Sequence, residues 1–172
     1  MPRSSFPGMG GRSGSRFMPA PGRLIQTGHH PFFVEIAVTT DNIAEFNVIV
    51  LRAIAILYKA HPVPVSLAAD QLTIPLAKRG EEDYVERMEV VQGTLRWLQD
   101  NGFVKGTLDT NITFAPMLSA QLRAFAYRIV SAKEPNAVNQ TLGEAVVNAA
   151  LQPGSREETV VSELVVRRLL GA

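Results

Sequence analysis

Residues 46–75 read FNVIVLRAIAILYKAHPVPVSLAADQLTIP, and residues 84–108 read YVERMEVVQGTLRWLQDNGFVKGTL. The longest apolar run of the chain extends from Val48 to Tyr58, and Arg52 is the charged residue that interrupts it. A run of this length is too short to span a bilayer and is typical of a buried helix. We therefore expect the fold to be organised around this helix.

The first expected helix begins at Asp41, whose carboxylate can accept hydrogen bonds from the free backbone amides of a first turn. It ends before His61, because Pro62 disfavours the helical conformation for the residue that precedes it. Apolar residues recur along it at helical spacing: Ile43, Phe46, Val50, Ile54 and Leu57. Other apolar residues flank this stripe, which predicts a helix that is buried on most sides at the centre of the domain.

Two further helices follow in the sequence. Ser66 can cap a short helix over Leu67–Leu72, and a longer helix is expected from about Glu82 to Asp100. The longer helix has an apolar stripe at intervals of three and four residues: Tyr84, Met88, Val91, Leu95 and Leu98. Gly102 stands where a helix end favours a positive φ.

A small hairpin is expected next, with strands at Phe103–Thr107 and Ile112–Phe114 joined by a turn at Leu108–Asn111. This order of three helices and a hairpin, over residues 41–115, resembles the winged helix-turn-helix superfamily. The run from Val65 to Leu72 is similar to the second helix of that family. The resemblance implies a mainly α fold with a small β-hairpin, in which the third helix and the hairpin, or wing, contact duplex DNA. It also implies a regulator of transcription that acts as a homodimer.

The third expected helix opens with carboxylates rather than with the side chains that read bases. The acids are Glu81, Glu82, Asp83, Glu86 and Glu89, with Arg87 as the nearby cation. Carboxylates would be repelled by phosphates, although acids also complement the dipole at a helix start. They could equally mark an interface for a basic protein. A second function therefore stays open, a non-catalytic winged-helix adaptor that binds protein partners within a larger complex.

The segment that precedes this core divides into two parts. Residues 1–30 are rich in Gly, Ser and Pro and contain no acid, which is typical of a flexible basic arm or a solvated tail. Residues 32–39 alternate as a half-buried strand does, and they could pair with the hairpin or with a second subunit. We assign residues 31–115 to the winged-helix domain. The candidate phosphate contacts are Arg12, Arg16, Arg23, Lys78, Arg79, Arg87, Arg96 and Lys105.

Residues 116–172 are expected to form a C-terminal extension of three helices. Pro116 suits the first turn of a fourth helix. Its apolar stripe would be Leu118, Leu122, Phe125 and Ile129. Two capping boxes, in which Ser or Thr is followed three residues later by Glu, open the other two helices. They are Thr141 with Glu144, which opens a helix through Leu151, and Ser155 with Glu158.

The sixth expected helix has more apolar surface than one small domain readily covers. The residues that present it are Val161, Leu164, Val165 and Leu169. A helix that follows a wing commonly forms a dimer interface in winged-helix regulators, so these four residues are predicted to contact a partner. The alternative is that the helix packs on the first helix of its own chain.

The composition excludes several function classes. The formal net charge is +1, so the overall charge gives no argument for nucleic acid, and the absence of cysteine excludes disulfides and thiolate metal sites. No phosphate-binding glycine loop, paired-histidine metal motif or nucleophile elbow is present. We therefore predict a protein that is not an enzyme and takes no cofactor or metal. We also expect a cytoplasmic location and no membrane association.

Overall fold

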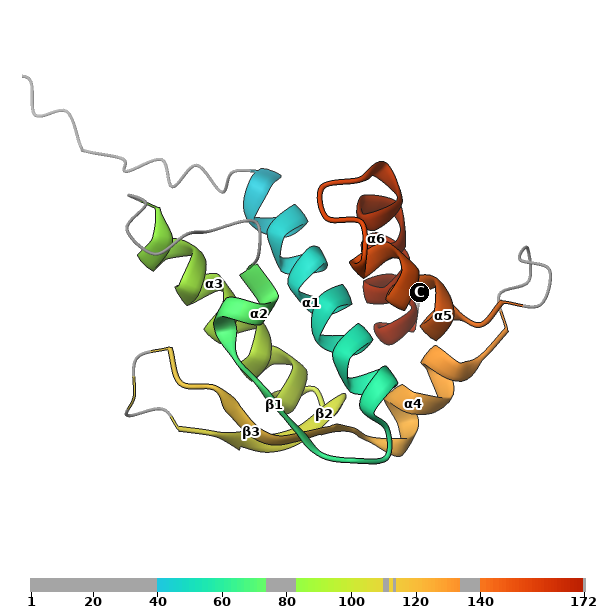
Figure 1. Ribbon diagram of the computed structural model, residues 1–172, viewed down its shortest axis with the longest axis horizontal. Helices are drawn as coiled ribbons and strands as arrows, with labels where there is room; N and C mark the ends of the chain where they lie inside the picture. The colour runs from blue at the N-terminus through green and yellow to red at the C-terminus, as the bar shows by residue number, and fades with distance from the viewer. Residues whose placement is uncertain (1–39, 74–82, 110–111, 113, 134–139, 172) are drawn as a thin grey trace, which may run out of the picture. The chain divides into compact units, whose positions relative to one another are not determined.

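The computed structural model describes residues 40–73, 83–109, 112, 114–133 and 140–171. The predicted arm and the predicted strand at residues 32–39 lie outside these ranges. The elements, in chain order, are α1 (Thr40–Ala60), β1 (Val65–Leu67), α2 (Ala69–Thr73), α3 (Tyr84–Asp100), β2 (Val104–Leu108), β3 (Met117–Leu122), α4 (Ala124–Ser131), α5 (Leu142–Ala150) and α6 (Arg156–Leu169) (Figure 1).

Helix α1 lies at the centre of the described part of the chain. It runs between α2 and α3 on one side and α5 and α6 on the other (Figure 1). Ile49, Leu51 and Ile54 on this helix are fully buried. The prediction of a helix buried on most sides is therefore confirmed. The helix begins at Thr40, so Asp41 lies inside its first turn rather than before it.

The sheet has three antiparallel strands in the order β1-β3-β2. The prediction that Ser66 caps a helix is wrong, because Ser66 lies in β1, and α2 starts three residues later. β1 pairs with β3 through Val65 opposite Ala120 and Leu67 opposite Met117. The second strand of the hairpin is thus β1's neighbour, so β1 supplies a third strand that the sequence analysis did not predict.

Two predictions for the segment after β2 are also wrong. The second hairpin strand is Met117–Leu122 rather than Ile112–Phe114, and the fourth helix begins at Ala124 rather than at Pro116. The β2–β3 register shifts between Lys105 and Thr107, and Ser119 in β3 has a φ of +51°. This irregularity breaks the alternation of a regular strand, so the buried residues Met117 and Ala120 lie three positions apart rather than two.

Helix α3 begins two residues later than predicted and ends at Asp100 as predicted. Four members of its predicted stripe are buried, namely Met88, Val91, Leu95 and Leu98. Gly102 follows the helix with a φ of +74°, which confirms the predicted end. The Phe103 amide donates to the Leu98 carbonyl at 3.0 Å and closes the last turn.

The helices α4, α5 and α6 form the C-terminal part, and α5 and α6 both pack on α1. Thr141 and Glu144 form the predicted capping box at the start of α5. Ser155 accepts from the Glu158 amide at the start of α6, but the Glu158 carboxylate points elsewhere. The described chain is mainly α-helical with one small antiparallel sheet, as the sequence predicts.

Candidate interaction surface and cavities

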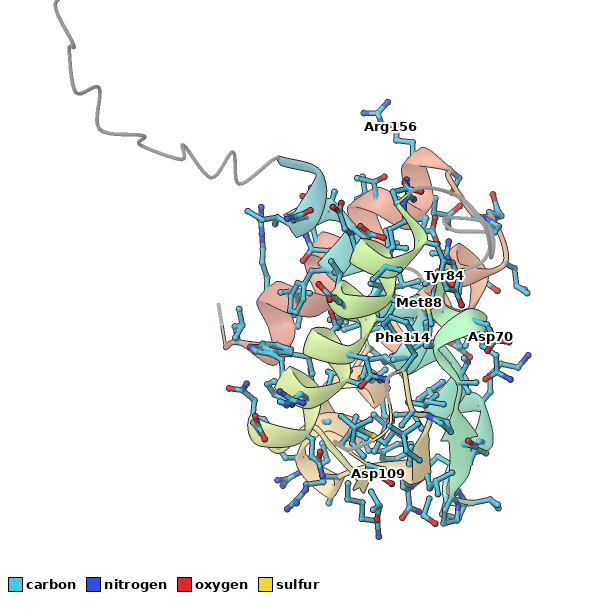
Figure 2. The ribbon with its side chains drawn as sticks, turned by 90° about the vertical axis from the view of Figure 1, so that its left-hand side faces the viewer. Asp70, Tyr84, Met88, Asp109, Phe114 and Arg156 are labelled. Atoms are coloured by element: carbon cyan, nitrogen blue, oxygen red, sulfur yellow. The ribbon has the colours of Figure 1, made fainter. Side chains whose placement is uncertain are left out.

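The solvent face of α3 consists of residues that recur about once per turn (Figure 2). Its exposed residues are Val85, Glu86, Glu89, Gly93, Arg96 and Asp100. Three carboxylates and one guanidinium therefore lie along this face. The predicted acid Asp83 stands next to the helix start, and Glu81 and Glu82 lie outside the described residues.

The predicted phosphate contacts on α3 and β2 fall into two groups. The Arg87 Nε donates to the Asp83 carboxylate at 2.6 Å, so its charge is paired with an acid one turn earlier. Arg96 and Lys105 are exposed, on α3 and β2 respectively. The structure does not describe the other five, which are Arg12, Arg16, Arg23, Lys78 and Arg79.

The four predicted partner-contact residues of α6 do not form one free surface. Val165 is fully buried and Leu169 is 3% exposed, because α6 packs on α1 and α5 of the same chain. Those two side chains are part of the hydrophobic core, so their assignment to a partner interface is wrong. Val161 and Leu164 are partly buried against the same core. The large apolar residues that α6 and its C-terminal end do expose are Val160, at 56%, and Leu170, at 61%.

A buried ion pair joins α1 to α6, and the sequence analysis does not identify it. Arg52 is 4% exposed and Glu158 is 2% exposed. The Glu158 Oε1 accepts from the Arg52 Nε at 2.9 Å and from Nη2 at 2.8 Å, while Nη1 donates to the Leu72 carbonyl at 3.0 Å. One guanidinium thereby holds the start of α6 and the end of α2 against the middle of α1.

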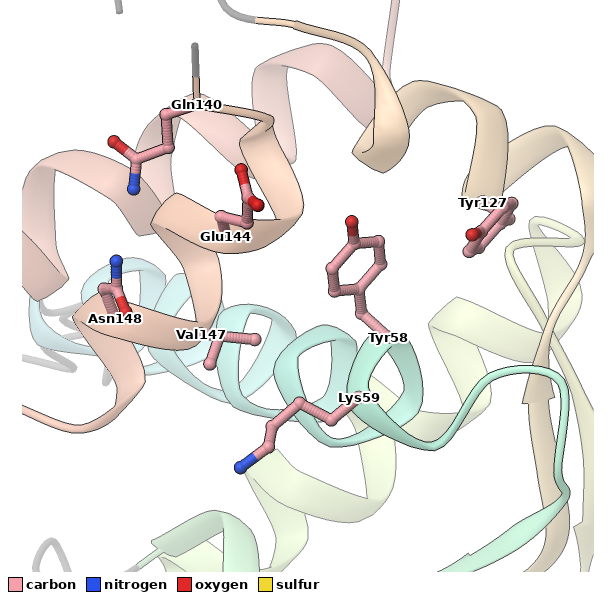
Figure 3. A pocket seen from close by; sticks show the side chains of 7 residues that line it. All are labelled: Tyr58, Lys59, Tyr127, Gln140, Glu144, Val147 and Asn148. Carbon is pink, nitrogen blue, oxygen red and sulfur yellow. The ribbon is translucent and has the colours of Figure 1, made fainter.

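The described chain has an open polar cleft of about 600 Å³ beside the end of α1 (Figure 3). Its lining includes Tyr58, Lys59, Tyr127, Gln140, Glu144 and Asn148. Tyr127 stacks with His61, at 3.9 Å between ring centroids, and with Tyr58, at 5.9 Å. The Tyr58 ring also lies directly over Gly143, where an added Cβ would come within 2.4 Å of it. Two tyrosine rings that contact each other therefore form part of the cleft wall.

The Glu144 carboxylate on the rim of this cleft is held ionised. It accepts from the Thr141 amide at 2.8 Å and from the Thr141 hydroxyl at 3.1 Å. These bonds to the backbone and side chain of Thr141 lower the pKa of Glu144 below its ordinary value.

A second cavity of about 230 Å³ lies where α2, α3 and the hairpin meet. Asp70, Tyr84, Met88 and Phe114 line it and gather on one side of the molecule (Figure 2). The Tyr84 and Phe114 rings meet edge to face at 6.3 Å. A third cavity of about 190 Å³ lies between α1, α2 and α5.

Among the described residues, no three His, Cys, Asp or Glu side chains are placed to hold a metal ion. No described helix has the length and apolar character needed to cross a membrane. Comparisons with protein-family models, with curated proteins and with solved structures find no match for this chain.

Proposed function

We propose that this chain is a non-catalytic winged-helix module that binds a protein partner through α3 and the adjoining hairpin. The order helix, strand, helix, helix, strand, strand, with β1-β3-β2 as the sheet, supports the winged-helix assignment. In that family the third helix presents the contact face. The assignment therefore directs attention to the solvent face of α3.

The composition of that face is the observation that carries the proposal. Glu86, Glu89 and Asp100 outnumber Arg96, and Arg87 is paired with Asp83. Phosphates would be repelled by this balance, because DNA binding depends on cations that replace its counterions. A basic protein surface is attracted by the same charges.

Exposed apolar residues on the same elements also favour a protein partner. Val85 on α3 is 54% exposed, and Ile112 in the β2–β3 connection is 57% exposed. Apolar side chains inside a polar rim are typical of protein interfaces. We infer that the partner presents a basic surface with an apolar contact near Val85.

Duplex DNA is the second candidate, and the exposed cations Arg96 and Lys105 favour it. In this alternative, the hairpin and the arginines of residues 1–30 would supply the phosphate contacts that α3 lacks. The homodimer and the cytoplasmic location stay predictions from the sequence.

Fluorescence anisotropy with random-sequence duplex DNA, at about 50 mM and 200 mM salt, separates the two candidates. The chain lacking residues 1–28 should show no salt-sensitive binding. The variant Glu86→Lys/Glu89→Lys should bind measurably, because it reverses the repulsive charges. Salt-sensitive binding by the truncated chain with its native α3 would reject the protein-partner proposal in favour of DNA.

A photo-crosslinker in place of Val85 tests the partner directly in cells that express the chain. One defined crosslinked protein should be recovered, and the Glu86→Lys/Glu89→Lys background should lose it. Glu157→Lys provides the control, because Glu157 is an exposed acid on α6. Equal crosslinking in the native and the Glu86→Lys/Glu89→Lys backgrounds would show that the acids of α3 do not select the partner.

A further inference from the structure

The cavity between α1, α2 and α5 combines an apolar wall with a few polar side chains. Its apolar lining consists of Ala55 and Ile56 from α1, Val147 and Ala150 from α5, and Leu151 at the end of α5. Leu151 is 70% exposed, so the cavity opens to solvent beside an apolar residue. Apolar walls favour a ligand with a hydrocarbon body.

The polar residues that line this cavity are two cations and an amide, namely Arg52, Lys59 and Gln71, and no carboxylate is among its lining residues. Arg52 is neutralised by Glu158, so Lys59 supplies the net charge. Figure 3 shows the Lys59 side chain extending away from Glu144 and the Tyr58 hydroxyl. An ammonium group in this position favours an anionic ligand group.

Gln71 adds a hydrogen-bond donor to this charge. The Gln71 Oε1 accepts from the Ala68 backbone amide at 3.4 Å. The Gln71 side-chain NH2 group is then the donor that a ligand can use. A carboxylate accepts from both an ammonium and an amide N–H. The two groups come from α1 and α2, so a ligand held by both would bridge these helices.

We propose that this cavity binds a small apolar carboxylate, with its hydrocarbon body against Ala55, Ile56 and Ala150 and its carboxylate at Lys59 and Gln71. The volume of about 190 Å³ fits such a molecule, since an apolar protein cavity of about 150 Å³ accommodates benzene. The site goes beyond the proposed partner binding and does not depend on it, because none of its lining residues lies on α3.

Hexanoate and hexylammonium are suitable probes, because they share a hydrocarbon chain and differ in the sign of their charge. Titration of the full chain, followed by backbone amide NMR, should show saturable shifts for hexanoate at Ala55, Ile56 and Ala150. We expect binding in about the millimolar range. Hexylammonium should bind about fivefold more weakly, which is the scale of one charge contact screened by water, because Lys59 is exposed.

Two variants test the two parts of the site. Lys59→Gln should weaken hexanoate about twofold, strengthen hexylammonium by a similar factor and so abolish the preference between the two probes. Ala150→Leu should fill the cavity and weaken both probes. Their controls are Lys133→Gln and Ala124→Leu, at exposed positions outside the cavity. Thermal melting of each variant confirms that it folds.

Each outcome of this experiment decides the proposal. Hexanoate shifts that map to α1 and α5, and that depend on Lys59, support it. Absence of saturable shifts would overturn it, and so would shifts located elsewhere in the chain. Equal binding of the two probes to the native chain would show that the cavity does not select carboxylates.

Discussion

Helices α5 and α6 begin with the same capping motif, but the glutamates of the two motifs lie in different environments. Residues 141–144 are Thr-Leu-Gly-Glu and residues 155–158 are Ser-Arg-Glu-Glu. In both, the Ser or Thr oxygen accepts from the amide of the Glu, at 3.2 Å in α5 and 3.0 Å in α6. The two glutamates then diverge. Glu144 returns to the Thr141 amide and stays exposed, whereas Glu158 is buried and binds Arg52.

This difference shows that a capping motif specifies where a helix begins and leaves the role of its acid open. The Glu144 contacts are all within three residues along the chain. The Glu158 contact to Arg52 spans 106 residues, and its Oε2 also accepts from the Gly154 amide at 2.7 Å. The first glutamate is a local feature and the second holds two helices together.

The largest expected difference between the two motifs concerns their glutamates. Glu158→Gln removes the charge that compensates the buried Arg52 guanidinium, and should cost about 3 kcal/mol of unfolding free energy. Glu144→Gln should cost far less, because its carboxylate is exposed. Urea unfolding of both variants measures the difference. Equal losses would contradict the distinction between a local and a long-range role.

The third position of each motif provides the next contrast. Gly143→Ala would place a methyl group against the Tyr58 ring, which must move, and should cost about 1–2 kcal/mol after the helix propensity gain. Glu157→Ala at the matching position of α6 should change stability by about 0.5 kcal/mol or less. Urea unfolding measures both, and near-UV circular dichroism should report the Tyr58 displacement only in Gly143→Ala. A neutral Gly143→Ala would mean that the ring has room to move.

The first residues of the motifs should behave alike. Thr141→Ala and Ser155→Ala each remove the hydroxyl oxygen that accepts from the amide of the glutamate three residues later. Each substitution should cost about 1 kcal/mol of unfolding free energy. Chemical unfolding of the two variants sharpens the comparison, because the helix-capping bond is common to both motifs. A loss confined to Ser155→Ala would indicate that the cap matters only where the acid is buried.

The smallest expected effect is a pH dependence from the α5 motif. Because the folded-state pKa of Glu144 lies below its ordinary value of 4.5, its contribution to stability is complete above that value. The contribution is lost as the pH falls through the folded-state pKa. Unfolding midpoints of native and Glu144→Gln protein, measured from neutral to acidic pH, should converge at low pH. A constant difference across the range would contradict the lowered pKa.

The features of the fold that could be predicted from the sequence are those that nearby residues determine. The burial of α1 follows from its apolar run, and the end of α3 follows from Gly102 and its positive φ. The start of α5 follows from Thr141 and Glu144. Each of these features depends on residues within a few positions of one another.

The features that were predicted wrongly depend on residues far apart in the sequence. Serine is a favourable helix-capping residue, but Ser66 lies in strand β1, which is stabilised by pairing with β3. Strand β3 lies some fifty residues later in the chain, so the residues near Ser66 do not reveal this pairing. Leu118 and Leu122 lie four positions apart, as on one helix face, but β3 is irregular at Ser119, so Leu118 is exposed while Leu122 is buried. Pairing between strands overrode the local preference in both cases.

The candidate site shows the same limit. The acids of α3 and the exposure of Arg96 and Lys105 could be anticipated, but the pairing of Arg87 and the burial of Val165 could not. Arg52 is an interruption of an apolar run when only the sequence is considered. Its partner is identified only when α1 and α6 are placed side by side.

A double-mutant cycle on Arg52 and Glu158 tests most directly whether this buried ion pair holds α6 against α1. Urea unfolding would compare Arg52→Met, Glu158→Leu and the combined variant with the native chain. The account predicts that the combined variant is more stable than the sum of the two losses implies, with a coupling of about 2 kcal/mol. Additive losses would contradict the account, because they would mean that the two side chains stabilise the fold independently.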